Sequence, residues 1–288
     1  MTEPIDAPAP DHRARHDRPT WNAYLDHLAR ETARAHTVLA DLDPATPVPS
    51  CPDWSAADLL WHLAEVQQAW AQIVRERPAS PDVLPEGARR PTEHPDLLAH
   101  ARACASDLVR TLRGSEPSDP AWTWAGWSPD GATVGFAYRR QTHEALIHRV
   151  DAELAAGARA QDVVLEADLA ADGVAECLEV MLGGQPDGAG LVPVGTALVL
   201  DLTDVGVRIG VQPGQLSGHD RLTGRELSGP HLLVVPAPDA PAAVVSGTAA
   251  HLDLWLWGRL PRDTPLVRRR GSAASLEAFD AATTFPID

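Results

Sequence analysis

Hydrophobic positions in the first half of the chain recur every three or four residues, which is typical of amphipathic helices. The clearest stripe runs through residues 21–42 and predicts a first helix. Its members are Trp21, Leu25, Leu28, Thr32, Ala35, Leu39 and Leu42. A second stripe follows a Pro-rich turn at residues 47–52. Ser55 and Asp58 form a variant of the capping box there, which predicts that a second helix begins near Ala56.

Glycine and proline mark the ends of the helices in this half. The second helix is expected to stop before Pro78. Residues 96–113 predict a third helix that ends at Gly114, because glycine accepts the left-handed conformation common after helices. Residues 136–156 predict a fourth helix, closed by Gly157. Four helices without a convincing strand predict a helical bundle.

The pattern changes after Gly157. Residues 197–202 and 205–211 alternate between apolar and polar side chains and predict a β-hairpin. The other elements expected here are helices at 165–182, 249–260 and 273–282, strands at 231–235 and 242–246, and a glycine-rich loop at 183–190. The second half is therefore predicted to be α+β.

These patterns divide the chain into three parts. Residues 1–18 are rich in Pro, Asp, His and Arg and predict a disordered tail. Residues 19–160 are expected to form the helical bundle, and residues 161–288 a smaller α+β domain. A length of 288 residues is sufficient for two domains, each with its own hydrophobic core.

Composition and charge narrow the class of protein. Hydrophobic residues make up 44% of the chain and charged residues 22%, as in ordinary globular proteins. No apolar run approaches the ~20 residues needed to cross a bilayer, so a membrane protein is excluded. A net charge of -16 opposes binding to nucleic acid. The 3 cysteines have no metal-binding or disulfide spacing and favour a reducing cytoplasm.

Candidate chemistry lies on the predicted fourth helix. Gln141, Glu144, His148 and Asp151 follow one another at spacings of three or four residues and form a polar stripe between apolar neighbours. Glu144 and His148 are separated by about 40° of helical rotation, so their side chains can converge on one metal ion. His62, at the edge of the apolar face of the second helix, could supply a third ligand.

The spacing alone leaves other interpretations open. The composition produces roughly three pairs of histidine and acid at a four-residue spacing by chance. Glu144 and His148 could therefore form a hydrogen-bonded core pair or a surface ion pair instead of a metal site. A zincin-type motif is excluded, because it needs histidines four residues apart and His143 lies five residues before His148.

Two segments resemble the mycothiol-dependent maleylpyruvate isomerase family. Residues 51–63, CPDWSAADLLWHL, resemble its helix-two signature, and residues 139–153, RRQTHEALIHRVDAE, resemble its helix-four segment. Residues 252–259, LDLWLWGR, are similar to part of its C-terminal domain. The likeness extends from about Trp21 to Phe279.

The resemblance implies a DinB-like four-helix bundle followed by a sterol-carrier-like α+β domain. It also implies a divalent metal ion, of the Zn²⁺ type, bound by His62, Glu144 and His148. Mycothiol or a similar low-molecular-weight thiol would be the cosubstrate. Asp151 is expected to orient His148, and Arg139, Arg140 and Arg208 are candidate anchors for a substrate carboxylate.

The expected function is an isomerase or thiol S-transferase in which a metal-activated thiol attacks a small electrophilic substrate. Two alternatives stay open, a metal-dependent hydrolase and a non-catalytic binding protein of the same fold. We expect a cytoplasmic monomer or weak homodimer that binds neither nucleic acid nor membrane.

Overall fold

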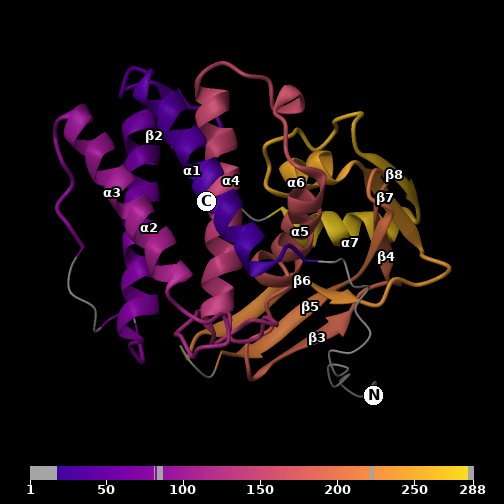
Figure 1. The fold of residues 1–288 in the computed structure, drawn as a ribbon. Helices are drawn as coiled ribbons and strands as arrows, with labels where there is room; N and C mark the ends of the chain where they lie inside the picture. The colour runs from indigo at the N-terminus through magenta and orange to yellow at the C-terminus, as the bar shows by residue number, and fades with distance from the viewer. Residues whose placement is uncertain (1–17, 81, 83–86, 221–223, 285–288) are drawn as a thin grey trace. The chain divides into compact units, whose positions relative to one another are not determined.

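The computed structural model describes residues 18–80, 82, 87–220 and 224–284. The chain divides into two compact units (Figure 1). One unit is Pro19–Val163, and the other is Val164–Asp288 together with Met1–Arg18. The predicted boundary lay three residues earlier, at residue 160. The predicted disordered tail lies outside the described residues, apart from Arg18.

Four long helices form the bundle of the first unit, as the sequence predicted. They are α1 (Trp21–Ala40), α2 (Ala56–Glu76), α3 (His94–Arg113) and α4 (Val134–Ala155). A short 3-10 turn, η3 (Ala160–Asp162), follows them. Helix α1 packs most closely on α4 and α2 on α3, with smaller contacts between α1 and α3 and between α2 and α4 (Figure 1). The α1/α3 seam therefore lies opposite the α2/α4 seam.

The capping box predicted for α2 is present. The Ser55 hydroxyl accepts a hydrogen bond from the Asp58 amide at 3.3 Å, and an Asp58 carboxylate oxygen accepts one from the Ser55 amide at 2.9 Å. Asp58 also accepts from the Arg90 guanidinium at 2.6 Å. These bonds satisfy amide groups that the first helical turn leaves without partners.

The prediction that Gly114 adopts a left-handed conformation is wrong. Gly114 caps α3 with φ of -89°, and its amide donates to the Arg110 carbonyl at 3.1 Å. The chain continues into another turn there, so a left-handed residue is not required. Helix α2 instead ends on Arg77, which has φ of 50°. Gly157 does have positive φ, 89°, after α4.

The first unit also contains strands that the sequence did not predict. Strands β1 (Pro47–Val48) and β2 (Cys51–Ser55) pair in antiparallel orientation. Prolines and a two-residue first strand hide this pairing, because they leave too short an alternating pattern to detect. Strand β2 leads directly into α2, so the start of the helix and the strand are fixed together.

The second unit is α+β, as predicted. Its helices are α5 (Ala167–Glu176), the π-helical segment η4 (Cys177–Met181), α6 (Ala249–Leu256) and α7 (Ala273–Thr283). Its strands are β3 (Ala189–Pro193), β4 (Leu198–Leu202), β5 (Val207–His219), β6 (Glu226–Val235), β7 (Ala243–Gly247) and β8 (Arg268–Gly271). The strand order is β3-β5-β4-β7-β8, and β6 pairs with β5. The predicted hairpin is β4–β5, with Leu202 opposite Val207.

Two strands of this sheet correct the sequence analysis. Strand β3 begins inside the segment read as a glycine-rich loop, and β8 consists mainly of arginines. Most residues of both strands are exposed, and each pairs along the sheet with one neighbour in the order above. An exposed edge strand needs few apolar side chains, so the apolar pattern is weak there. Within the described residues, no helix combines the length and apolarity needed to cross a bilayer.

Removal of the Ser55 cap tests the contribution of this junction to stability. Ser55→Ala is expected to lower the free energy of unfolding by about 1 kcal/mol, because the first turn of α2 loses a side-chain acceptor. Urea denaturation followed by circular dichroism measures the change. Glu93→Ala is the matched control, since Glu93 caps α3 without a side-chain hydrogen bond to the described residues. Equal losses in both variants would contradict the role given to the cap.

Candidate metal centre

Three potential ligands converge at the α2/α4 seam. His62 lies in the second turn of α2, and Glu144 and His148 lie one turn apart on α4. The His62 Nε2 atom is 3.0 Å from Glu144 Oε1, and the His148 Nε2 atom is 3.3 Å from the same oxygen. All three ligand atoms lie within 4.8 Å of one another. Helices far apart in the sequence thus bring one carboxylate and two imidazoles together.

The second oxygen of Glu144 is held by the same helix. Arg140, one turn earlier on α4, donates from Nη2 to Glu144 Oε2 at 3.0 Å. The Glu144 side chain is 16% exposed, whereas that of Arg140 is 4% exposed. This ion pair leaves Oε1 directed at the two imidazoles and fixes the carboxylate in one orientation.

Asp151 holds the other side of His148. The His148 Nδ1 atom donates to Asp151 Oδ2 at 2.9 Å. The Ser50 hydroxyl donates to the Asp151 Oδ1 atom at 2.5 Å, and the Cys51 thiol lies 3.8 Å from Oδ2. Because Nδ1 is occupied by this bond, His148 presents its Nε2 atom to Glu144.

An indole packs beside both histidines. The Trp54 ring lies 4.7 Å from the His62 ring and 5.8 Å from the His148 ring, centroid to centroid. Trp54 belongs to β2, immediately before α2. The strand therefore supplies both an apolar wall for the imidazoles and, through Ser50 and Cys51 near its start, contacts to Asp151.

The charges of the cluster stabilise one another. Burial by itself lowers the pKa of His148, but hydrogen bonds to Asp151 and Glu144 overcome it and raise the value from 6.5 to about 9. Burial raises the pKa of Glu144, whereas the bonds to His148 and His62 and the charge of Arg140 hold it well below its usual range. The buried carboxylate is therefore ionised and the imidazole of His148 protonated at neutral pH.

These residues fit a zinc-type cation. Donors bound tetrahedrally at about 2.1 Å from Zn²⁺ are separated by about 3.4 Å. The two measured separations from Glu144 Oε1, 3.0 and 3.3 Å, are close to that value. A histidine whose far nitrogen is tied to a carboxylate is also the usual environment of a zinc ligand. His62, Glu144 and His148 could therefore hold such an ion after the protons on Nε2 leave.

Other residues singled out in the sequence lie elsewhere. Arg139 is buried on α4, and Arg208 is exposed on β5 opposite Asp201. Arg208 belongs to the second compact unit, whereas the cluster belongs to the first. His143 is buried on α4 and packs edge-on against Tyr24 of α1, with 6.4 Å between the ring centroids.

Comparison with protein families decides where the chain belongs. Residues 25–153 match the model of the mycothiol maleylpyruvate isomerase N-terminal domain, and residues 168–278 match the MDMPI C-terminal domain. The chain belongs to the mycothiol-dependent maleylpyruvate isomerase family. The first match covers the helical bundle of this family member, and the second covers its sheet unit.

Two solved structures have the same fold as this family member. A mycothiol-dependent maleylpyruvate isomerase is 20% identical in sequence, with a TM-score of 0.57, and the match covers 90% of this chain and 97% of that one. A variant of such an isomerase with a histidine replaced by alanine is 17% identical, with a TM-score of 0.56 and the same coverage. The search of curated proteins found no match.

The sequence did not reveal every residue around the cluster. Ser50 and Trp54 were missed because their positions depend on the β1–β2 pairing. The cysteine spacing gave no sign that Cys51 would lie beside Asp151. The ion pair between Arg140 and Glu144 can be predicted from the sequence, because opposite charges four residues apart on a helix attract each other. The sequence analysis instead named Arg140 only as a candidate anchor for a substrate carboxylate.

The pKa of His148 predicts how stability depends on pH. Without bound metal, the folded protein keeps the His148 proton up to about pH 9, while the unfolded chain releases it near 6.5. This contribution is complete below 6.5 and is lost as the pH rises through 9. Urea denaturation of chelator-treated protein across this range is expected to show a falling free energy of unfolding.

Asp151→Asn is the comparison variant for this pH series. It removes the charge that accepts from His148 Nδ1, so the pKa of His148 falls and the loss of stability becomes shallower. A wild-type profile parallel to that of Asp151→Asn would show that this pair does not determine the pH dependence.

Proposed function

We propose that this protein is a metal- and thiol-dependent enzyme that catalyses cis–trans isomerisation of a small, conjugated carboxylic acid, as in maleylpyruvate isomerases. The observation that carries the proposal is the convergence of His62, Glu144 and His148 on one point. The names of the two similar structures support mycothiol as the thiol and maleylpyruvate as the first substrate to test.

The three side chains are proposed to hold a divalent cation of the Zn²⁺ type. Three protein ligands leave an open position, which is usual for catalytic rather than structural zinc sites. When bound there, the cation supplies positive charge that favours the deprotonated form of a thiol at neutral pH.

The surrounding residues have separate tasks in this proposal. Asp151 keeps the proton of His148 on Nδ1, so that Nε2 offers a lone pair. Arg140 keeps Glu144 ionised and aligned. Trp54 covers one side of the two imidazoles and limits access of water to them. The side chain of His62, 26% exposed, lies on the more accessible side of the cluster.

The proposed reaction balances without any other reactant. The thiolate sulfur adds to a carbon of the cis double bond, and the electron pair moves into the conjugated carbonyl group. Rotation about the resulting single bond is then fast. The electron pair returns, the carbon–sulfur bond breaks, and the trans isomer and the thiolate are released. The thiol is therefore a catalyst that is not consumed, whereas in S-transfer it would stay in the product.

Substrate binding needs a group that recognises carboxylate. Arg139 and Arg140 are the proposed anchors on α4, because a guanidinium can bind a carboxylate through two hydrogen bonds. Arg140 already donates to Glu144, so an anchoring role would require it to bind a carboxylate while it holds Glu144. A role for Arg208 in substrate binding stays a prediction.

Metal content provides the direct test of the three ligands. Wild-type protein dialysed against Zn²⁺ is expected to retain about one ion per chain. Glu144→Gln and His148→Ala are each expected to weaken zinc binding by at least about 100-fold, because each removes a direct ligand. Elemental analysis and competition with a chromogenic chelator measure both quantities.

Glu65→Gln is the matched control for the metal experiment. Glu65 is an exposed acid on α2, three residues after His62, and its replacement removes the same charge as Glu144→Gln. Zinc content that is the same in all four proteins would refute the proposed site. A loss shared by Glu65→Gln would indicate a general effect of charge.

Thiol dependence distinguishes isomerisation from its alternatives. With zinc-loaded protein and mycothiol, maleylpyruvate is expected to convert to its trans isomer at a rate at least about 100-fold above that without the thiol. Proton NMR follows the conversion and shows whether sulfur stays in the product. Recovery of the thiol unchanged supports isomerisation. A stable thioether product would indicate an S-transferase, and thiol-independent hydrolysis would indicate a hydrolase.

A further inference from the structure

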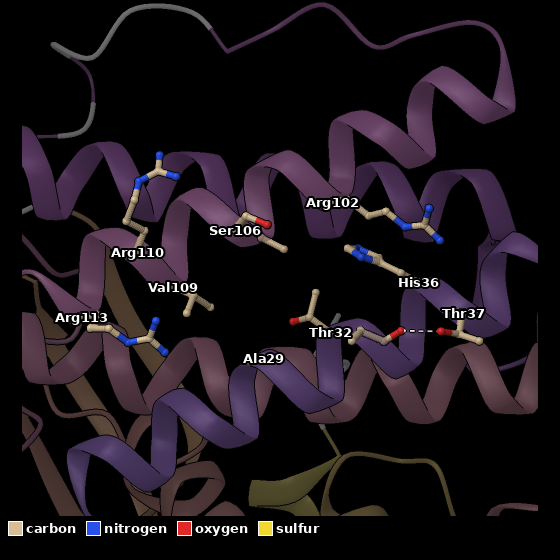
Figure 2. A pocket seen from close by; sticks show the side chains of 11 residues that line it. Ala29, Thr32, His36, Thr37, Arg102, Ser106, Val109, Arg110 and Arg113 are labelled. Carbon is tan, nitrogen blue, oxygen red and sulfur yellow. Dashed lines mark hydrogen bonds between the residues drawn. The ribbon is translucent and has the colours of Figure 1, made fainter.

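A second candidate site lies in the first unit, in the seam between α1 and α3. A groove of about 610 Å³ opens there (Figure 2). The seam is the one opposite α2 and α4, which carry the His62–Glu144–His148 cluster. The lining residues are Ala29, Thr32, Ala33, His36, Thr37, Arg102, Ala105, Ser106, Val109, Arg110 and Arg113.

The groove is strongly basic in an acidic protein. The chain carries a net charge of -16, yet none of the described residues that line the groove is acidic. Arg110 is paired with Asp107 at 2.5 Å. Arg102 and Arg113 make no hydrogen bond or ion pair with the described part of the chain. Two guanidinium groups are therefore available to a ligand.

The positive charges lie toward two ends of the groove. Figure 2 shows Arg102 beside His36 at one end and Arg110 with Arg113 toward the other. Arg102 and Arg113 are eleven residues apart on α3, which corresponds to about 16 Å along the helix axis. Alanine and valine side chains line much of the stretch between them, with hydroxyl groups from Thr32 and Ser106.

His36 adds a polar atom that lacks a partner. Its side chain is almost completely buried, at 3% exposure, and its Nε2 atom has no hydrogen-bond partner among the described residues. Burial, and then the charge of Arg102, lowers its pKa to about 4, so the imidazole is neutral at pH 7. A buried polar atom without a partner is costly. A ligand oxygen beside Arg102 would supply the missing partner.

We propose that the α1/α3 groove binds an elongated organic dianion, with an acidic group at each end and a hydrocarbon middle. One acidic group pairs with Arg102 and accepts from His36, and the other pairs with Arg113. The hydrocarbon part lies on Ala29, Ala33 and Val109 between them. A compact inorganic anion would reach only one of the two ends and would leave this apolar stretch uncovered.

Dodecanedioate is the probe for this site, used in calorimetric titrations of metal-free, full-length protein. Arg102→Ala and Arg113→Ala are each expected to weaken its binding about tenfold, the loss typical of one charge-assisted contact. Both arginines are exposed, so their replacement leaves the bundle intact, which circular dichroism checks. Arg159→Ala removes the same charge from an exposed position outside the groove and is expected to have little effect.

Four comparisons can overturn the proposal. Dodecanoate, with one carboxylate, is expected to bind at least about tenfold more weakly than dodecanedioate; equal affinity would refute a two-ended site. A loss in Arg159→Ala equal to that in Arg102→Ala would show that only net charge matters. Glu144→Gln is expected to bind dodecanedioate as the wild type does, and a loss there would place the probe at the metal centre instead. Inorganic phosphate that competes fully with dodecanedioate would also contradict the proposal.

Discussion

The carboxylate of Glu144 imposes the main constraint on the bundle. A buried negative charge is expensive unless nearby groups compensate it. Here two imidazoles share one oxygen, and a guanidinium holds the other. The compensating groups come from both α2 and α4, so these helices can pack only in a register that brings His62 to Glu144. The polar cluster thus specifies the seam geometrically, whereas apolar packing alone would tolerate small shifts.

The two seams of the bundle differ in the charges that they carry. At α2/α4 the charges are opposite in sign and close together, and they satisfy one another. At α1/α3 the charges have one sign and lie along the walls of a groove, with a buried imidazole nitrogen unsatisfied. The first arrangement suits a small cation, and the second suits an anion with some length. One four-helix scaffold therefore presents opposite electrostatic environments at opposite seams.

Much of this structure could be predicted from local patterns. The periodic stripes indicated α1 to α4, the capping box located the start of α2, and alternation indicated the β4–β5 hairpin. The polar stripe on α4 indicated the residues that come together with His62. The strands β3 and β8 were missed because exposed edges carry little apolar signal. Ser50, Trp54 and the placement of His36 beside Arg102 depend on contacts between separate elements, which spacing along the chain does not encode.

The short β1–β2 pair both supports the residues of the candidate metal centre and leads into the start of α2. Ser50 and Cys51 contact Asp151, Trp54 packs on the histidines, and Ser55 starts the helix that carries His62. An insertion anywhere between Ser50 and His62 would disturb the imidazoles and the helix start together. A chimera that exchanges parts between members of this family would therefore have to transplant residues 47–62 as one block, with Asp151 from the same parent.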